Sequence, residues 1–134
     1  MFLNQLERKN KEAFLKICVL AALSNGVFAQ EEKEMIGAYC REMNIPENIP
    51  DCSETLEDVL KELAISTSNK EKNIILLEIL GLVKSDGIYD EKEVDFMEKL
   101  SKGLDVKEGT LTKLNALLEI YTVVYKEIYL AIND

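Results

Sequence analysis

The chain has 134 residues, 25 of them acidic and 16 basic, and its formal net charge at pH 7 is -9. Because it contains no histidine, it has no histidine general base, no Ser-His or Cys-His nucleophile and no ordinary zinc site, which excludes most familiar hydrolase mechanisms. The acidity opposes binding to nucleic acid, whose phosphates attract lysine and arginine. Apolar residues make up 47% of the sequence, which in a chain of this length predicts one globular domain over residues 1–134.

The first apolar segment of the chain, residues 14–23, resembles the apolar core of a signal peptide. Acidic residues Glu7 and Glu12 precede it, whereas a signal peptide begins with a basic segment. We therefore expect a helix over about 11–23 and a cytoplasmic protein. The longest uninterrupted apolar run, 17–23, is too short to cross a membrane, so no direct membrane insertion is expected.

An internal repeat organises the chain, because residues 13–45 match residues 74–106 without a gap. The identical pairs include Leu15 with Leu76, Ser24 with Ser85, Gly26 with Gly87 and Glu32 with Glu93. Two copies favour pseudo-two-fold symmetry over a solenoid, which needs three or more repeats. Each copy is expected to form a helix, a tight loop and a second helix.

The two helices of each copy have different apolar patterns. The first helices, over about 11–23 and 69–84, are apolar on nearly every side, as is typical of helices at the centre of a bundle. The second helices are amphipathic and should cover that centre. Their apolar stripes are Met35, Ile36, Tyr39 and Met43 in the first copy and Val94, Met97, Leu100 and Leu104 in the second.

Two prolines mark a loop between the copies, and Ser53 after them is a candidate cap for a further helix. Apolar residues at helical spacing follow, namely Leu56, Val59, Leu60, Leu63 and Ala64. Ser68 and Glu71 have the spacing of a capping box, which predicts the start of the next helix near residue 69. The three cysteines form no C-x-x-C pair, and we expect reduced thiols that pack as small apolar side chains.

A long helix is expected over about 111–132, after Gly109. Tyr121, Tyr125 and Tyr129 recur every four positions along it and so line one side. They are interpreted either as half-buried packing with hydroxyls that reach water, or as a surface for a protein partner or a second copy. Because no segment alternates with period two, the predicted fold class is all-α, with about seven helices in a single bundle.

The junction between the two helices is the best-preserved part of the repeat. On a structural interpretation, its glycine closes the first helix in the left-handed conformation, and the acidic residues stabilise the start of the next helix. Asp90 and Glu93 have the spacing of a capping box. In that case the loops serve only the architecture.

A site for a divalent cation is the alternative interpretation of these loops. Calcium, magnesium and manganese prefer carboxylate and carbonyl oxygens. The candidate ligands are Asp86, Asp90 and Glu93 from the second copy and Asn25 and Glu32 from the first. A standard EF-hand is not expected, because its first two ligand positions would be Leu82 and Lys84.

With two apolar helices, each followed by a short glycine loop and a glutamate, the chain resembles the TerB tellurite-resistance family over about Lys11 to Val106. The resemblance implies an all-helical duplicated fold and a cytoplasmic, stress-associated protein without established catalytic activity, whose acidic loops bind metal. Asp86 and Glu93 match the family's acidic pair. In the first copy Glu32 matches, but Asn25 replaces the aspartate, which weakens a symmetric metal site.

The expected function is therefore that of a non-enzymatic, TerB-like protein of tellurite resistance or stress response, with a divalent cation as its candidate cofactor. The alternative is a scaffold that docks another protein and uses its acidic loops only as structure. Carboxylate acid-base catalysis would need two acids with separated pKa values in one pocket. The sequence shows no such pocket, so no enzymatic activity is expected.

Overall fold

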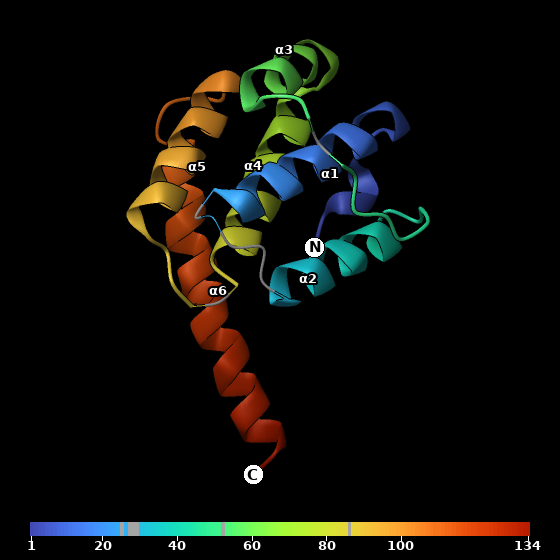
Figure 1. Ribbon diagram of the computed structural model, residues 1–134. Coiled ribbons are helices and arrows are strands. Elements are labelled where there is room, and N and C mark those ends of the chain that lie inside the picture. The colour runs from blue at the N-terminus through green and yellow to red at the C-terminus, as the bar shows by residue number, and fades with distance from the viewer. Residues whose placement is uncertain (25, 27–29, 52, 86) are drawn as a thin grey trace.

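The computed structural model describes residues 1–24, 26, 30–51, 53–85 and 87–134. These residues form six α-helices, one short 3-10 segment and no β-strand (Figure 1). The elements are η1 (Leu3–Gln5), α1 (Arg8–Leu23), α2 (Gln30–Glu42), α3 (Leu56–Ser66), α4 (Asn69–Val83), α5 (Glu91–Gly103) and α6 (Thr110–Ile132). The all-α class is confirmed, whereas the count of about seven helices is not, because the additional helical segment in the described residues is a single 3-10 turn.

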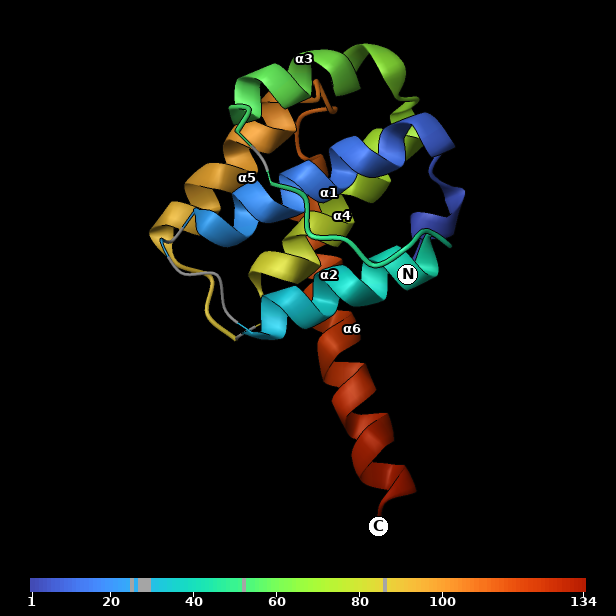
Figure 2. The same ribbon diagram turned by 45° about the vertical axis from the view of Figure 1, so that its right-hand side comes forward.

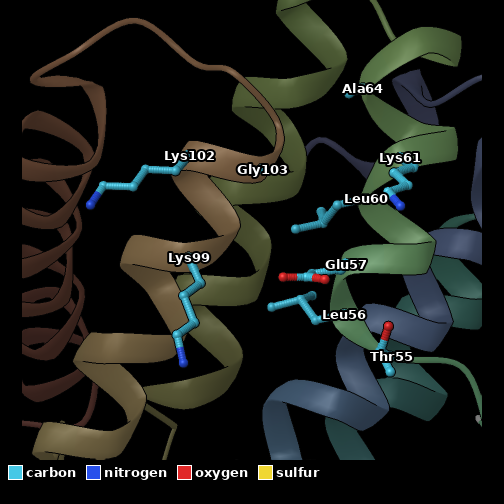
Figure 3. Close-up of a pocket in the computed structure, with 9 residues that line it drawn as sticks. All are labelled: Thr55, Leu56, Glu57, Leu60, Lys61, Ala64, Lys99, Lys102 and Gly103. Atoms are coloured by element: carbon cyan, nitrogen blue, oxygen red, sulfur yellow. The ribbon is translucent and has the colours of Figure 1, made fainter.

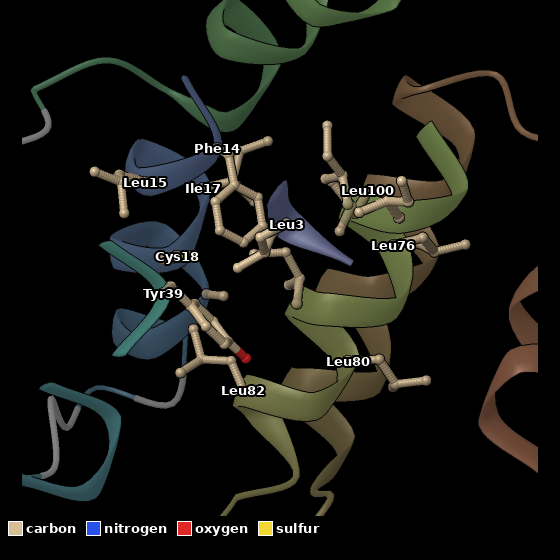
Figure 4. Packing of buried hydrophobic residues seen from close by; sticks show 14 of the residues in the cluster. Leu3, Phe14, Leu15, Ile17, Cys18, Tyr39, Leu76, Leu80, Leu82 and Leu100 are labelled. Atoms are coloured by element: carbon tan, nitrogen blue, oxygen red, sulfur yellow. The ribbon is translucent and has the colours of Figure 1, made fainter. Parts of the chain in front are cut away.

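The two helices that bury the most residues, α1 and α4, pack against each other at the centre of the molecule. Their buried side chains, together with η1, form most of the core (Figure 4). Phe14 of α1 packs on the ring of Tyr39 from α2, with the ring centroids 5.7 Å apart. The hydroxyl of Tyr39 donates to the backbone oxygen of Glu78 in α4 at 3.0 Å, which satisfies its hydrogen bond inside the core.

The amphipathic helices cover this central pair. Helix α2 packs on α1 and α4, and α5 packs on α3, α4 and α6 (Figure 2). The predicted stripe of α5 needs one correction: Phe96 is buried, whereas Val94 is only partly buried. Cys18 and Cys40 are fully buried free thiols, as predicted, while Cys52 lies outside the described residues.

Side-chain caps define where α3 and α4 begin. The predicted capping box of α4 is present, with Ser68 Oγ accepting from the Glu71 backbone N–H and Glu71 Oε1 accepting from Ser68 N–H, both at 3.2 Å. The prediction of Ser53 as a cap was wrong. Thr55 caps α3 instead and accepts from Asp58 N–H at 3.2 Å, because a cap must immediately precede the first helical residue.

The first residues of the chain are fixed on α2 and α4. The Met1 ammonium lies 2.7 Å from Glu78 and 3.0 Å from Glu42. The Leu3 N–H donates to Glu42 at 2.6 Å, and the Leu3 side chain is fully buried. Helix α1 consequently begins at Arg8, three residues earlier than predicted.

Helix α6 is the longest element, with 23 residues. Its first half packs on α4 and α5, and its second half extends away from the rest of the molecule (Figures 1 and 2). Leu111, Leu114 and Leu118 contact the core but remain partly exposed. None of the helices formed by the described residues combines the length and apolarity needed to cross a bilayer.

Candidate functional site

The two junction loops turn in the same way. Gly26 has a φ of 84° and Gly87 a φ of 82°, the left-handed conformation that closes a helix and that glycine adopts without strain. Their N–H groups donate to Leu23 O at 2.9 Å and to Lys84 O at 3.1 Å. The predicted helix-closing role of both glycines is confirmed.

Two predicted ligands of the second loop form a capping box instead of leaving both carboxylates to solvent. Asp90 Oδ1 accepts from Glu93 N–H at 2.9 Å, and Glu93 Oε1 accepts from Asp90 N–H at 3.1 Å. Glu93 is only 1% exposed. These bonds confirm the structural interpretation for this pair, and they engage one oxygen of each carboxylate.

Glu32 occupies the corresponding place in the first copy. It is the third residue of α2, as Glu93 is the third residue of α5, and both side chains are buried. A carboxylate in the first turn of a helix is stabilised by the backbone N–H groups and the helix dipole. The repeat therefore places a buried acid at the start of each second helix.

The cation site is incomplete in the part of the chain that the structure describes. Asn25 and Asp86, two of its candidate ligands, lie outside the described residues. Among the described residues, no three acidic or cysteine side chains are grouped closely enough to hold a metal ion. The described members of the set, Glu32, Asp90 and Glu93, thus fit helix starts by themselves, and the metal interpretation depends on the two remaining positions.

Lys84 connects the end of α4 to α6 beside the second loop. Its ammonium donates to Asn115 Oδ1 at 2.6 Å and to Glu119 Oε1 at 3.2 Å. It also lies 5.4 Å from the ring centroid of Tyr89, within the range of a cation–π contact. A cavity of about 540 Å³ opens in this angle between α4, the loop and α6. Burial, and then the charges of Glu98 and Glu93, raise the pKa of Tyr89.

The tyrosine stripe lies on the projecting half of α6. Tyr121, Tyr125 and Tyr129 are between 48% and 59% exposed, and the rings of Tyr121 and Tyr125 lie 6.2 Å apart. The interaction surface predicted from the sequence comprised these three tyrosines and did not include the other apolar residues that surround them. These are Ile120, Val123, Val124, Ile128, Leu130 and Ile132, all at least half exposed. Their occurrence on every side of 120–132 was the available signal, since such a helix is normally buried.

A groove between α3 and α5 was also not predicted. It has a volume of about 980 Å³, and Figure 3 shows Leu56, Glu57 and Leu60 extending from α3 toward α5. Lys99 and Lys102 lie on the opposite side, on α5. Because these residues come from helices separated in the chain, no local sequence pattern reveals their proximity.

Comparison with known proteins gives the fold a counterpart. No protein-family model and no curated protein matches the chain. Among solved structures, the chain is similar to a tellurite resistance protein from Nostoc punctiforme, with a TM-score of 0.70 and 22% sequence identity. The match covers 90% of this chain and 78% of that protein. The TerB-like resemblance seen in the sequence is thereby confirmed at the level of the fold.

Proposed function

We propose that this protein is a non-enzymatic interaction module of a tellurite or stress response, and that the projecting half of α6 is its docking surface. The observation that carries the proposal is the half-exposed apolar surface around Tyr125 and Tyr129, since contiguous exposed apolar patches mark interaction sites. The structural neighbour's tellurite resistance supplies the cellular context.

Direct capture of tellurite is the less favourable alternative for such a protein. Tellurite is an oxyanion, and a chain with a net charge of -9 repels anions. An interaction role needs no such binding. We place the protein in the cytoplasm, and the free thiols Cys18 and Cys40 support a reducing compartment.

The proposal is tested by tellurite survival of a sensitive bacterial host that expresses the chain. We expect Tyr125→Ala with Tyr129→Ala to abolish the protection given by the wild type, because truncation removes the aromatic contacts of the docking surface. Ile65→Ala is the matched control, since Ile65 is an exposed apolar residue outside α6. Full protection by the double variant, present at the wild-type level, would reject α6 as the functional surface.

Cation binding by the acidic loops is a second proposed function. It is supported by the buried carboxylates of Glu32 and Glu93 at matching positions of the two copies. A metal that binds only the folded chain would stabilise it by about 2.7 kcal/mol at a hundredfold excess over Kd. The stability that a helix cap contributes does not depend on the metal concentration.

Thermal unfolding in calcium, magnesium or manganese separates these two roles of the loops. We expect one of these ions to raise the melting temperature of the wild type, and Asp86→Asn to remove that rise without disturbing the capping box. Glu91→Gln removes the same charge from an exposed neighbour and should leave the rise intact. Melting temperatures that do not change with any of the three ions would leave the loops a structural role alone.

We also propose that the two halves of the chain are related by a pseudo-two-fold axis. Asn10 and Glu71 occupy equivalent positions when the repeat is extended toward the N-terminus, and Asn10 Nδ2 donates to Glu71 Oε2 at 2.9 Å. Equivalent residues that contact each other lie close to a two-fold axis, which supports the proposed symmetry.

A further inference from the structure

The folded chain exposes more surface than a monomer of its mass is expected to expose. A 15.2 kDa monomer should expose about 7,100 Å², whereas this chain exposes 8280 Å². The excess is roughly 1,200 Å², more than the 800 Å² or so that each partner buries in a standard protein interface. The surplus surface is thus large enough for a stable dimer.

The projecting half of α6 concentrates the large exposed apolar side chains of the chain. Helix α3, which follows α2, has 11 residues, whereas α6, which follows α5, has 23. The side chains of α6 that contact the core end at Leu118. Beyond that point, residues 120–132 carry large apolar side chains that are at least 48% exposed.

The apolar residues of α6 have the spacing of a coiled-coil seam. Leu114, Leu118, Tyr121, Tyr125, Ile128 and Ile132 recur at alternating steps of four and three, the pattern that packs one helix along another. Leu114 and Leu118 pack through this seam onto the core of the rest of the molecule, the part from η1 to α5, which we call the body. The continuation of the seam, from Tyr121 to Ile132, has no covering element among the described residues.

We propose that residues 120–132 of α6 pack antiparallel against the same segment of a second copy of this chain. This inference rests on the proposed function, because it names the partner of the docking surface. A symmetric contact uses one patch twice, so the same apolar surface is complementary to itself. No second, complementary surface has to be sought elsewhere on the molecule.

The antiparallel direction follows from the position of the body and from side-chain size. Parallel helices would bring both bodies to the same end of the seam, on the face that already carries Leu118. Antiparallel helices place the bodies at opposite ends. They also set Tyr121 against Ile132 of the second copy and Tyr125 against Ile128, so that each layer combines a large ring with a smaller side chain.

Sedimentation equilibrium of the full chain tests the dimer. We expect the wild type to have twice the chain mass, and the variant Tyr125→Glu with Ile128→Glu to have half the wild-type mass, because two charges enter the seam. Ile65→Glu places a charge on an exposed apolar residue of α3 and should leave the mass unchanged. Circular dichroism melting verifies that both variants fold, and Tyr125→Ala with Tyr129→Ala provides a milder second variant.

Cysteine cross-linking tests the direction. Mixed Tyr125→Cys and Ile128→Cys chains should form a disulfide between the two variants more readily than either forms with itself. Cys18 and Cys40 are buried and should not interfere. Any disulfide that one of them forms can be identified by mass spectrometry. A preference for disulfides between identical variants would overturn the antiparallel arrangement.

Three results would overturn the dimer itself. These are a wild type that remains monomeric throughout the micromolar range, a dimer unaffected by the Glu substitutions, and a monomer that sediments with phosphatidylcholine vesicles through α6. The tellurite assay separates this inference from the proposed function. A monomer whose Tyr125 and Tyr129 variant loses protection refutes only the dimer, whereas a dimer whose disruption leaves protection intact refutes only the proposed function.

Discussion

Glu71 connects three segments of the chain through one carboxylate. Its Oε2 accepts from the Glu7 backbone N–H and from Asn10 Nδ2, both at 2.9 Å, and its Oε1 accepts from Ser68 N–H at 3.2 Å. Burial raises the pKa of Glu71, but the hydrogen bonds from Glu7, Asn10 and Ser68 together lower it by more than burial raises it, so the net pKa lies below the ordinary value. The ionised form is therefore the one that stabilises the fold.

The lowered pKa of Glu71 determines how the stability of the fold depends on pH. A depressed pKa in the folded state contributes stability above the pKa of the unfolded chain, and that contribution is lost as the pH falls through the folded value. We expect Glu71→Gln to lower the free energy of unfolding at pH 7 by about 1–3 kcal/mol, with a smaller difference below about pH 4. Urea unfolding across this pH range measures it.

Glu62→Gln is the control for this experiment, because Glu62 is exposed and the substitution removes the same charge. It should leave the acid limb of the stability curve unchanged. An equal loss at pH 7 and at acid pH for Glu71→Gln would show that its charge plays no part.

The Met1 ammonium should make stability depend on pH in the opposite direction from Glu71. Burial lowers its pKa, but hydrogen bonds to Glu78 and Glu42 and their charges raise it by more, so the net pKa is raised. A raised folded pKa gives stability that is complete below the unfolded value, near pH 8, and is lost as the pH rises through the folded value. We expect the melting temperature to decline between about pH 8 and pH 10, and Glu78→Gln to weaken this decline. Glu62→Gln, at an exposed site, should preserve it.

The contacts that could be predicted at this scale are the local ones. The pairs Ser68 with Glu71 and Asp90 with Glu93 were predicted because a capping box has a fixed spacing of three residues. The contact of Lys84 with Glu119 could not be predicted, because it joins residues far apart in the chain. For Asn25 and Asp86 the metal hypothesis stays a prediction.

At the scale of the elements, Gly103 sets how closely α3 approaches α5. A Cβ added at Gly103 would lie 2.3 Å from Leu60 Cδ1 and 3.3 Å from Leu60 Cβ. We expect Gly103→Ala to destabilise the fold by about 1–3 kcal/mol through overpacking, although alanine favours helices. The same substitution at Gly37, where the nearest atom would be 3.5 Å away, should stabilise it by about 0.5–1 kcal/mol. Urea unfolding compares the two variants.

A double-mutant cycle identifies the cause. Leu60→Ala alone should cost about 2–5 kcal/mol because it leaves a cavity. Combined with Gly103→Ala, it should cost less than the sum of the two single changes, because the new methyl group enters the space that leucine vacated. Additive losses would mean that the two residues do not contact each other.

The helices themselves could be predicted more accurately than their environment. Helix α6 was expected over about 111–132 and spans Thr110–Ile132, because its apolar spacing is a property of the chain. What covers each side is not a local property, so the projection of its second half could not be foreseen. The Ser53 error has a similar origin, since two hydroxyl residues precede α3 and only Thr55 adjoins its first turn.

At the scale of the whole molecule, two opposing forces act on the proposed dimer. The apolar halves of α6 attract each other, whereas each copy carries a net charge of -9. Like charges at the distances between two bodies repel through solvent, and salt screens that repulsion over a Debye length of about 8 Å at physiological ionic strength. Apolar contact is not weakened by screening.

Salt should therefore strengthen the association. We expect the dissociation constant to fall severalfold as sodium chloride rises from about 0.05 M to about 0.5 M, where the Debye length shortens to a few ångströms. Sedimentation equilibrium at both concentrations measures it, and Ile65→Glu serves as the control because it adds charge without altering the seam. An association that weakens with salt would instead show that ion pairs between the two copies hold them together, because salt screens attraction between opposite charges as effectively as it screens repulsion.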